Sequence, residues 1–197
     1  MVFPQVQVTI ESIDLDGNGI GHVDGKVHFI DGAITGETVI AEITRVKPSY
    51  SKGRTLTVLN SVSTRTIPKC PHYGVCGGCA MQHIETNAQV AIKNRALEDL
   101  LQRIGKQKPE QMMPPIYGSF WGYRHRARLS TRFVIKKDRF FVGFHEKASS
   151  YVADMQECHV LPKHVSNMLV PLGNMMVTLS IYMRLPQIEL AVGDGVT

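Results

Sequence analysis

Three of the four cysteines in this sequence lie within ten residues of one another, a spacing that indicates metal chemistry. Cys70, Cys76 and Cys79 are separated by five and by two residues, and Cys158 follows far downstream. Three thiols this close cannot all form relaxed disulfides. They can converge on one metal centre, because the two glycines before Cys79 allow the backbone to wrap around it. The spacing therefore predicts a metal or cluster site to which Cys158 supplies the fourth ligand.

The spacing alone leaves the identity of this centre open between zinc and an iron–sulfur cluster, because four thiolates bind either. Since four thiols are available, we expect the nearby His72, His83 and His159 to remain outside the coordination shell. The sequence begins without the basic and apolar regions of a secretory signal, and no stretch approaches a membrane span. We therefore expect a cytoplasmic protein, in which cysteines are kept reduced.

Basic residues alternate along a second informative segment, residues 121–133. If this segment is a strand, its even-numbered side chains share one face, so four arginines project together. These are Arg124, Arg126, Arg128 and Arg132. The chain has a formal net charge of +5, and residues 121–147 contain 8 Lys and Arg residues but only two acidic residues. The excess favours an external polyanion, and the planar guanidinium fork suits phosphate, so we predict that this face binds RNA.

The first 62 residues have the pattern of a small β domain. Val6, Val8 and Ile10 alternate with polar residues, which is the two-residue period of a half-buried strand. Asp24 and Gly25 suit a tight hairpin turn, because both residue types tolerate positive φ. Five short strands in about sixty residues predict an OB-like barrel, an architecture that leaves few free sheet edges.

Two segments of this first domain, residues 13–21 (IDLDGNGIG) and 36–39 (GETV), resemble a TRAM domain. The resemblance implies that residues 1–62 form an RNA-binding module. Its basic loop then offers cations for phosphates and an aromatic ring for stacking on a base. We expect these contacts from Lys47, Lys52 and Tyr50.

A polar, proline-containing segment near residue 63 predicts a domain boundary, so that residues 63–197 form a second domain. Strand patterns after residue 120 and over residues 187–197 predict a mixed, mostly antiparallel sheet. The chain is therefore expected to be mainly β, with an α+β second domain that carries a helix and the four-cysteine site. We expect this domain to continue beyond residue 197.

The helix of the second domain is predicted from its start signal and its apolar period. Thr86 and Gln89 have the spacing of a capping box. Apolar residues then recur at near-helical spacing, namely Val90, Leu97, Leu101 and Ile104. Gly105 is a plausible stop, and Lys93 lies off the apolar stripe, where we count it among the RNA contacts.

In order along the chain, these features resemble the bacterial 23S ribosomal RNA (uracil-C5)-methyltransferases of the RlmD (RumA) type. The resemblance rests on the cysteine pattern after a TRAM-like domain and on residues 122–130, 142–149 and 186–189. It implies that Cys70, Cys76, Cys79 and Cys158 hold a [4Fe-4S] cluster, and that both domains grip 23S rRNA.

The same resemblance implies parts that this sequence lacks. No Gly-x-Gly segment leads from a strand into a predicted helix, and no fifth cysteine is available as a nucleophile. We therefore expect the S-adenosylmethionine site and the catalytic residues to lie in a missing C-terminal domain. The 197 residues are expected to be monomeric and, alone, inactive.

Two other classes of protein fit part of the pattern. A freestanding RNA-binding module with a structural four-cysteine metal site would use the same cysteines and arginines. An electron carrier would use the cluster, but it gives no reason for a strand lined with arginines. A reading frame that continues past Thr197 into a methyltransferase domain would distinguish the methyltransferase from the freestanding module.

Overall fold

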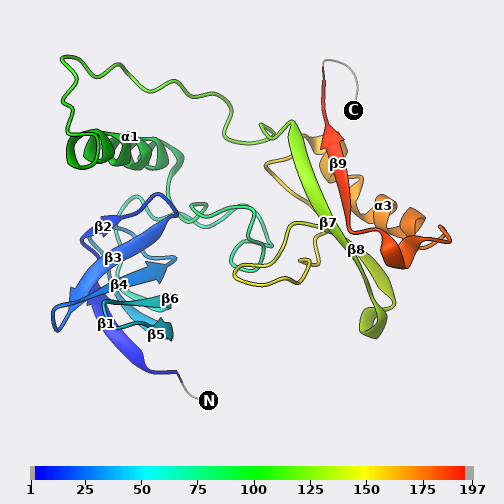
Figure 1. The fold of residues 1–197 in the computed structure, drawn as a ribbon, viewed down its shortest axis with the longest axis horizontal. Coiled ribbons are helices and arrows are strands. Elements are labelled where there is room, and N and C mark those ends of the chain that lie inside the picture. Colours follow the sequence, from blue (N-terminus) through cyan, green and yellow to red (C-terminus); the bar gives the residue numbers. More distant parts are fainter. Residues whose placement is uncertain (1–2, 194–197) are drawn as a thin grey trace. The chain divides into compact units, whose positions relative to one another are not determined.

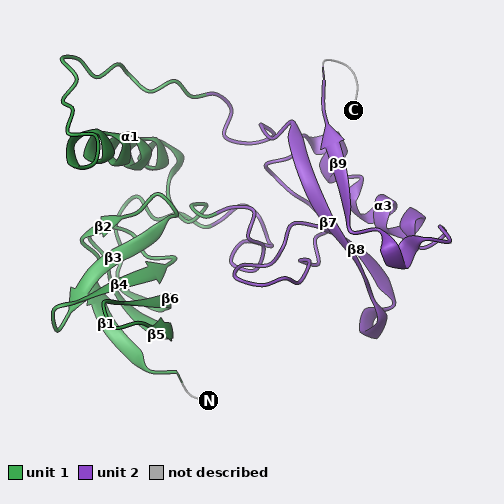
Figure 2. Ribbon diagram, viewed as in Figure 1, with its two compact units in different colours: residues 1–67, 80–117 green, residues 68–79, 118–197 purple. Residues whose placement is uncertain are grey.

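The computed structural model describes residues 3–193, and the chain divides into two compact units (Figure 2). Unit 1 comprises Met1–Ile67 and Ala80–Tyr117, and unit 2 comprises Pro68–Cys79 and Gly118–Thr197. The chain thus enters unit 2 at residue 68, returns to unit 1 after residues 70–79, which we call the cysteine clip, and leaves unit 1 again at residue 118. The first three cysteines and Cys158 all belong to unit 2.

Unit 1 contains one curled six-stranded sheet with the strand order β1-β5-β6-β4-β3-β2 (Figure 1). Its strands are β1 (Gln5–Thr9), β2 (Ser12–Ile13), β3 (Asn18–Val23), β4 (Lys26–Asp31), β5 (Thr38–Val46) and β6 (Tyr50–Asn60). All neighbours pair antiparallel except β4 and β6, which are parallel. The prediction of a mainly β first domain is confirmed, with six strands in place of the expected five because the short β2 follows β1 as a separate strand.

The curl of this sheet encloses a small apolar core. Its buried residues are Val8, Ile10, Ile30, Ala33, Val39, Ala41 and Ile43. Gly21 in β3 is required for the close approach of β1, because a Cβ at this position would overlap the carbonyl oxygen of Thr9. The alternation that predicted the first strand therefore corresponds to real burial, with Val8 only 1% exposed.

The segment after β6 is attached to the sheet by a buried ion pair. Glu37 is fully buried, and the Arg65 guanidinium donates to both of its carboxylate oxygens at 2.6 Å and to the Gly32 carbonyl oxygen at 2.8 Å. The Ile34 N–H also donates to this carboxylate, at 2.9 Å. Burial raises the pKa of Glu37, but the hydrogen bonds from Arg65 and Ile34 outweigh it and hold the pKa below its usual value.

Replacement of Arg65 by alanine is expected to destabilise unit 1 by about 3–5 kcal/mol, because it leaves the Glu37 carboxylate buried without its partner. Hydrogen exchange of the β4 and β5 amides measures this loss. Arg54→Ala is the matched control, since Arg54 is 64% exposed in its pair with Glu42 and should cost at most about 1 kcal/mol. Because the pKa of Glu37 is lowered by folding, the wild-type contribution is present at neutral pH and is lost as the pH falls through the folded pKa. Equal exchange rates in the two variants would contradict this assignment.

Helix α1 (Thr86–Arg103) belongs to unit 1 and begins one residue earlier than predicted. Glu85 is the N-cap, because its carboxylate accepts a hydrogen bond from the Ala88 N–H at 3.0 Å. The Gln89 side chain donates instead to the Ile84 carbonyl oxygen, so the predicted Thr86 capping box does not form.

The predicted apolar stripe of α1 is wrong in its C-terminal half. The helix packs through Ala88 and Ile92 against a small cluster formed by Ile34, Met81 and Ile84. Farther along, Leu97 is 49% exposed and Ile104 is 76% exposed. Periodicity indicated an amphipathic helix but could not indicate how much of its apolar face would be covered.

Unit 2 is built on a three-stranded antiparallel sheet with the order β8-β7-β9 (Figure 1). Its elements are β7 (Arg126–Val134), the 3-10 helix η1 (Ile135–Lys137), β8 (Arg139–Gly143), α2 (Lys163–Ser166), α3 (Leu169–Met176), η2 (Tyr182–Arg184) and β9 (Gln187–Ala191). The expectation of a strand over 187–197 is met by β9, and residues 194–197 lie outside the described residues.

One face of the unit 2 sheet packs against a core that includes the cysteines. Leu129, Phe140 and Val142 of the sheet join Cys76 and Cys158 in one buried cluster. Gly173 allows α3 to approach β8, because a Cβ there would lie 2.6 Å from the Phe140 carbonyl oxygen. Cys76 and Cys158 are therefore part of the apolar core of unit 2, and Cys79 packs against it.

The compact units differ from the predicted domains in the place of residues 80–117. The sequence put them in the second domain, whereas α1 packs within unit 1. Independent folding of residues 1–62 and 63–197 stays a prediction, and limited proteolysis tests it. In the part of the chain that the structure describes, no helix is long and apolar enough to cross a membrane.

Candidate metal centre and nucleic-acid interface

The four cysteines all lie in unit 2, although Cys158 is distant in sequence. None forms a disulfide; Cys70, Cys76 and Cys158 are buried, and Cys79 is half-buried. Burial raises the pKa of Cys70, Cys76 and Cys158, and the charge of neighbouring cysteine thiolates raises each further. Cys76 and Cys158 lie in one buried cluster and Cys79 packs against it, whereas a site shared by all four thiols stays a prediction.

Backbone amides already point at three of these sulfur atoms. The Gly78 N–H donates to the Cys76 Sγ at 3.3 Å. His72 donates in the same way to Cys70, and the amides that follow Cys158 donate to its sulfur. In each case an amide two residues after the cysteine is a donor, and these bonds lower the thiol pKa against the effect of burial. Such donors favour the thiolate form, the form that binds metals.

Within residues 3–193, no group of three or more His, Cys, Asp or Glu side chains is arranged to hold a metal ion. The three histidines near the cysteines in the sequence make other contacts. His72 Nε2 accepts a hydrogen bond from the Gln156 N–H at 3.2 Å. His159 lies edge-on to the Trp121 ring and 3.7 Å from the Glu157 carboxylate, whereas His83 is buried in unit 1.

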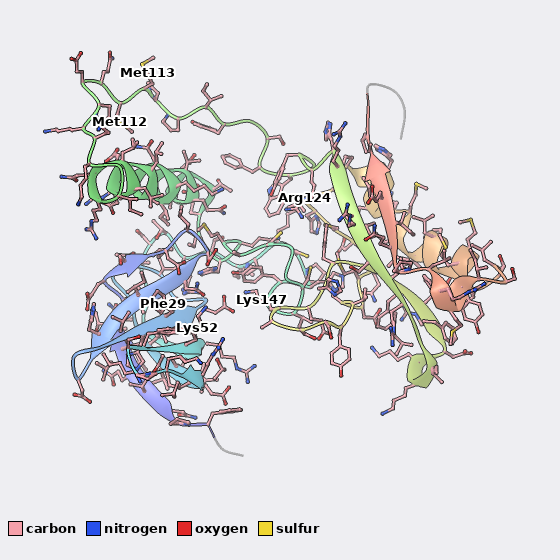
Figure 3. The ribbon with its side chains drawn as sticks, viewed as in Figure 1. Phe29, Lys52, Met112, Met113, Arg124 and Lys147 are labelled. Carbon is pink, nitrogen blue, oxygen red and sulfur yellow. The ribbon has the colours of Figure 1, made fainter. Side chains whose placement is uncertain are left out.

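Arg124 lies at the cysteine site and not on the arginine face. Its guanidinium donates to the Gly78 carbonyl oxygen at 3.4 Å and lies 5.1 Å from the centre of the Phe144 ring (Figure 3). Its positive charge also contributes to lowering the pKa of Cys158. The prediction that Arg124 shares a face with the other arginines fails because β7 begins only at Arg126, so strand alternation does not extend to residue 124.

The other three arginines do share the exposed face of β7. Arg126, Arg128 and Arg132 are exposed, and the intervening Leu129 and Thr131 are buried on the opposite face. Arg128 pairs with Glu189 of β9 at 2.9 Å. In the described part of the chain, neither Arg126 nor Arg132 has an ion-pair partner.

Internal carboxylates neutralise more of this region than the sequence predicted. Lys137 and Arg139 both pair with Asp154, at 2.9 and 3.2 Å. Asp154 and Glu189 lie outside residues 121–147, so a charge count over that window could not include them. Arg126 and Arg132 are therefore the cations of this face that remain for an external anion.

A second candidate interface lies on the sheet of unit 1. Lys47 and Lys52 are exposed, and the Tyr50 ring packs edge-on against Phe29 with ring centres 5.7 Å apart. Phe29 is the cross-strand partner of Lys52, so an aromatic pair and a cation lie on neighbouring strands (Figure 3). The sequence indicated Tyr50 but missed Phe29, which only the parallel pairing of β4 and β6 brings to this place. Lys93 is exposed on α1.

Comparison with known proteins first defines the class of the N-terminal part. Residues 1–56 match the TRAM domain, which confirms the predicted resemblance. Over 87% of its length, the chain also has the fold of part of the tRNA (uracil-54, C5)-methyltransferase from Pyrococcus abyssi. This crystal structure matches with a TM-score of 0.56 at 22% identity, and the chain covers 36% of it.

The curated relatives are more specific. The chain is 57% identical over 194 residues to the 23S rRNA (uracil(1939)-C(5))-methyltransferase RlmD of Chromobacterium violaceum, which covers 98% of this chain and 38% of that protein. It is 58% identical over 188 residues to RlmD of Bordetella avium, with coverage of 95% and 40%. The predicted resemblance to RlmD-type enzymes is confirmed. The chain spans about two fifths of the length of these relatives.

Proposed function

We propose that this chain is the RNA-recognition part of a cytoplasmic, S-adenosylmethionine-dependent methyltransferase that makes 5-methyluridine in 23S rRNA. The observation that carries the proposal is the match to RlmD proteins over 98% of the chain at 57% identity. Transfer of the methyl group requires a cofactor site and a nucleophile, which we assign to a domain outside these residues. The 197 residues alone are then an RNA-binding fragment, monomeric and inactive.

A chimaera tests this function directly. The matching stretch of the Chromobacterium violaceum RlmD is replaced by this chain, and methyl incorporation into 23S rRNA from cells that lack the enzyme is measured. We expect methylation of the same uridine as with the parent enzyme. A folded chimaera that binds S-adenosylmethionine but methylates no 23S rRNA would overturn the proposal.

For RNA binding we assign the strongest contacts to Arg126 and Arg132, because neither forms an ion pair with a carboxylate of the described residues. Arg128 contributes less, since Glu189 already neutralises it. Lys47, Lys52, Tyr50 and Lys93 form the proposed contacts of unit 1, joined by Phe29. Arg124 is proposed to support the cysteine site in place of the RNA contact expected from the sequence.

We also propose that Cys70, Cys76, Cys79 and Cys158 hold a [4Fe-4S] cluster, as the resemblance to RlmD-type enzymes implies. Support comes from the cluster that buries Cys76 and Cys158 beside Cys79, from the amides aimed at three of the cysteine sulfurs, and from the nearby Arg124 cation, since bound thiolates carry negative charge. When bound, the cluster would cross-link the clip to the loop that carries Cys158. Iron and acid-labile sulfide are expected in anaerobically purified protein, together with broad visible absorption. Stoichiometric zinc in colourless protein would show the alternative centre.

A further inference from the structure

A short hairpin over residues 145–152 presents one tyrosine to solvent. His145 and Val152 form its bridge, and the Glu146 N–H donates to the Tyr151 carbonyl oxygen at 2.9 Å. Ala148 turns the chain with a φ of 51°, a conformation that few residues other than glycine adopt. Tyr151 is 74% exposed at this turn.

The hairpin is held in place from two sides. On one side it pairs with the cysteine clip, since the Gly77 N–H donates to the His145 carbonyl oxygen and the Lys147 N–H donates to that of Val75, both at 2.8 Å. On the other side, Ser130 Oγ of β7 lies 2.9 Å from His145 Nε2. An exposed ring on a fixed hairpin loses little conformational freedom when a ligand binds to it.

Three other tyrosine rings are already used in packing. Tyr50 packs on Phe29, Tyr182 packs on Phe133 with ring centres 5.1 Å apart, and the Lys147 ammonium group lies 5.2 Å from the centre of the Tyr73 ring. Among the described residues, no ring or cation packs against Tyr151. Its faces are therefore open to a planar ligand.

The hydrogen bond between Ser130 and His145 places this hairpin beside the arginine face. Ser130 lies between Arg128 and Arg132 on the same side of β7, because strand side chains alternate. A nucleic acid whose phosphates contact Arg132 thus passes next to the hairpin, and aromatic rings beside cationic grooves stack on nucleobases.

We infer that Tyr151 is a base-stacking platform for a single-stranded nucleotide of the RNA that the arginine face binds. The inference rests on the proposed RNA-binding function and adds a site for the base. The stacking site is then linked to the clip, because Cys76 forms an antiparallel bridge with Glu146 of the hairpin.

Binding of an oligouridylate of about 12 nucleotides and of an abasic oligomer of equal length tests this site with the full chain. Tyr151→Ala is expected to weaken oligouridylate binding by about 5- to 50-fold and to leave abasic binding unchanged, since stacking needs a base. Tyr151→Phe keeps the ring and should remain within about twofold of wild type. Ser150→Ala, at the neighbouring exposed position, controls for disturbance of the turn and should change neither affinity.

Several results would overturn the assignment. Unchanged oligouridylate binding by Tyr151→Ala would refute it, and so would an equal loss for the abasic oligomer, which would show a contact to the backbone. If Tyr151→Ala has no effect while loss of Arg126 and Arg132 weakens binding, only the stacking site is wrong. If the wild-type chain binds neither oligomer nor a 23S rRNA fragment, the proposed RNA-binding function fails as well.

Discussion

Replacement of Cys158 by serine is expected to abolish binding of the proposed [4Fe-4S] cluster and to unfold unit 2. Cys158 is 5% exposed and belongs to the hydrophobic core of unit 2. Its replacement therefore removes a proposed ligand and also disturbs this core. Structural metal centres contribute on the order of 10 kcal/mol, comparable with the whole stability of an ordinary domain. Iron and sulfide content and visible absorption measure the first effect, and limited proteolysis measures the second.

His159→Ala is the matched control for this experiment, because it changes the adjacent residue and a side chain that we place outside the coordination shell. It should retain full iron, sulfide and colour. A Cys158→Ser protein with the wild-type cluster content would show that Cys158 is not a ligand. Loss of the cluster in His159→Ala would show that the shell includes a histidine.

The pattern of proteolysis carries further information. Without the cluster, cleavage is expected first in residues 68–79 and 118–193, whereas α1 and the curled sheet of unit 1 stay protected. The domain boundary predicted from the sequence would instead expose residues 80–117 together with the clip. An apo protein as resistant as the holo protein would show that the centre does not stabilise unit 2.

The sequence predicted secondary structure correctly where neighbouring residues alone determine it. The alternation of Val6, Val8 and Ile10 corresponds to β1 and the residues just after it. The arginine alternation is also correct within β7, where Leu129 and Thr131 face the core. In each case one residue period determines which side chains share a face.

The predictions failed where the cause is tertiary. Arg124 has the right parity for the arginine face, but it precedes β7 and its guanidinium reaches the clip. The free charge of residues 121–147 was overestimated because Asp154 and Glu189 approach from other segments. Leu97 and Ile104 have helical spacing, yet the packing of α1 ends near Ile92. These contacts depend on residues far apart in the sequence, so the local spacing of residue types cannot predict them.

Removal of both unpaired arginines, Arg126→Gln with Arg132→Gln, is expected to weaken binding of a 23S rRNA fragment by about 10- to 100-fold at low salt. Each arginine that neutralises a phosphate releases condensed counterions, so the slope of log K against log salt concentration should fall by about 1.4 for single-stranded RNA. Fluorescence anisotropy over a salt series measures both quantities. The cluster content should stay unchanged, because neither side chain contacts the cysteines.

Arg184→Gln is the matched control for the double variant, because Arg184 is exposed in the same unit but belongs to η2 and not to the alternating arginines of β7. It should leave the salt slope within about 0.3 of the wild-type value, since no phosphate contact is lost. Arg124→Gln separates the two roles proposed for the arginines. It should lower cluster retention, because the Gly78 contact is lost, and change the salt slope less than the double variant does. If the double variant binds the RNA fragment like wild type at every salt concentration, the face of β7 does not bind RNA, and the contacts must lie on the sheet of unit 1.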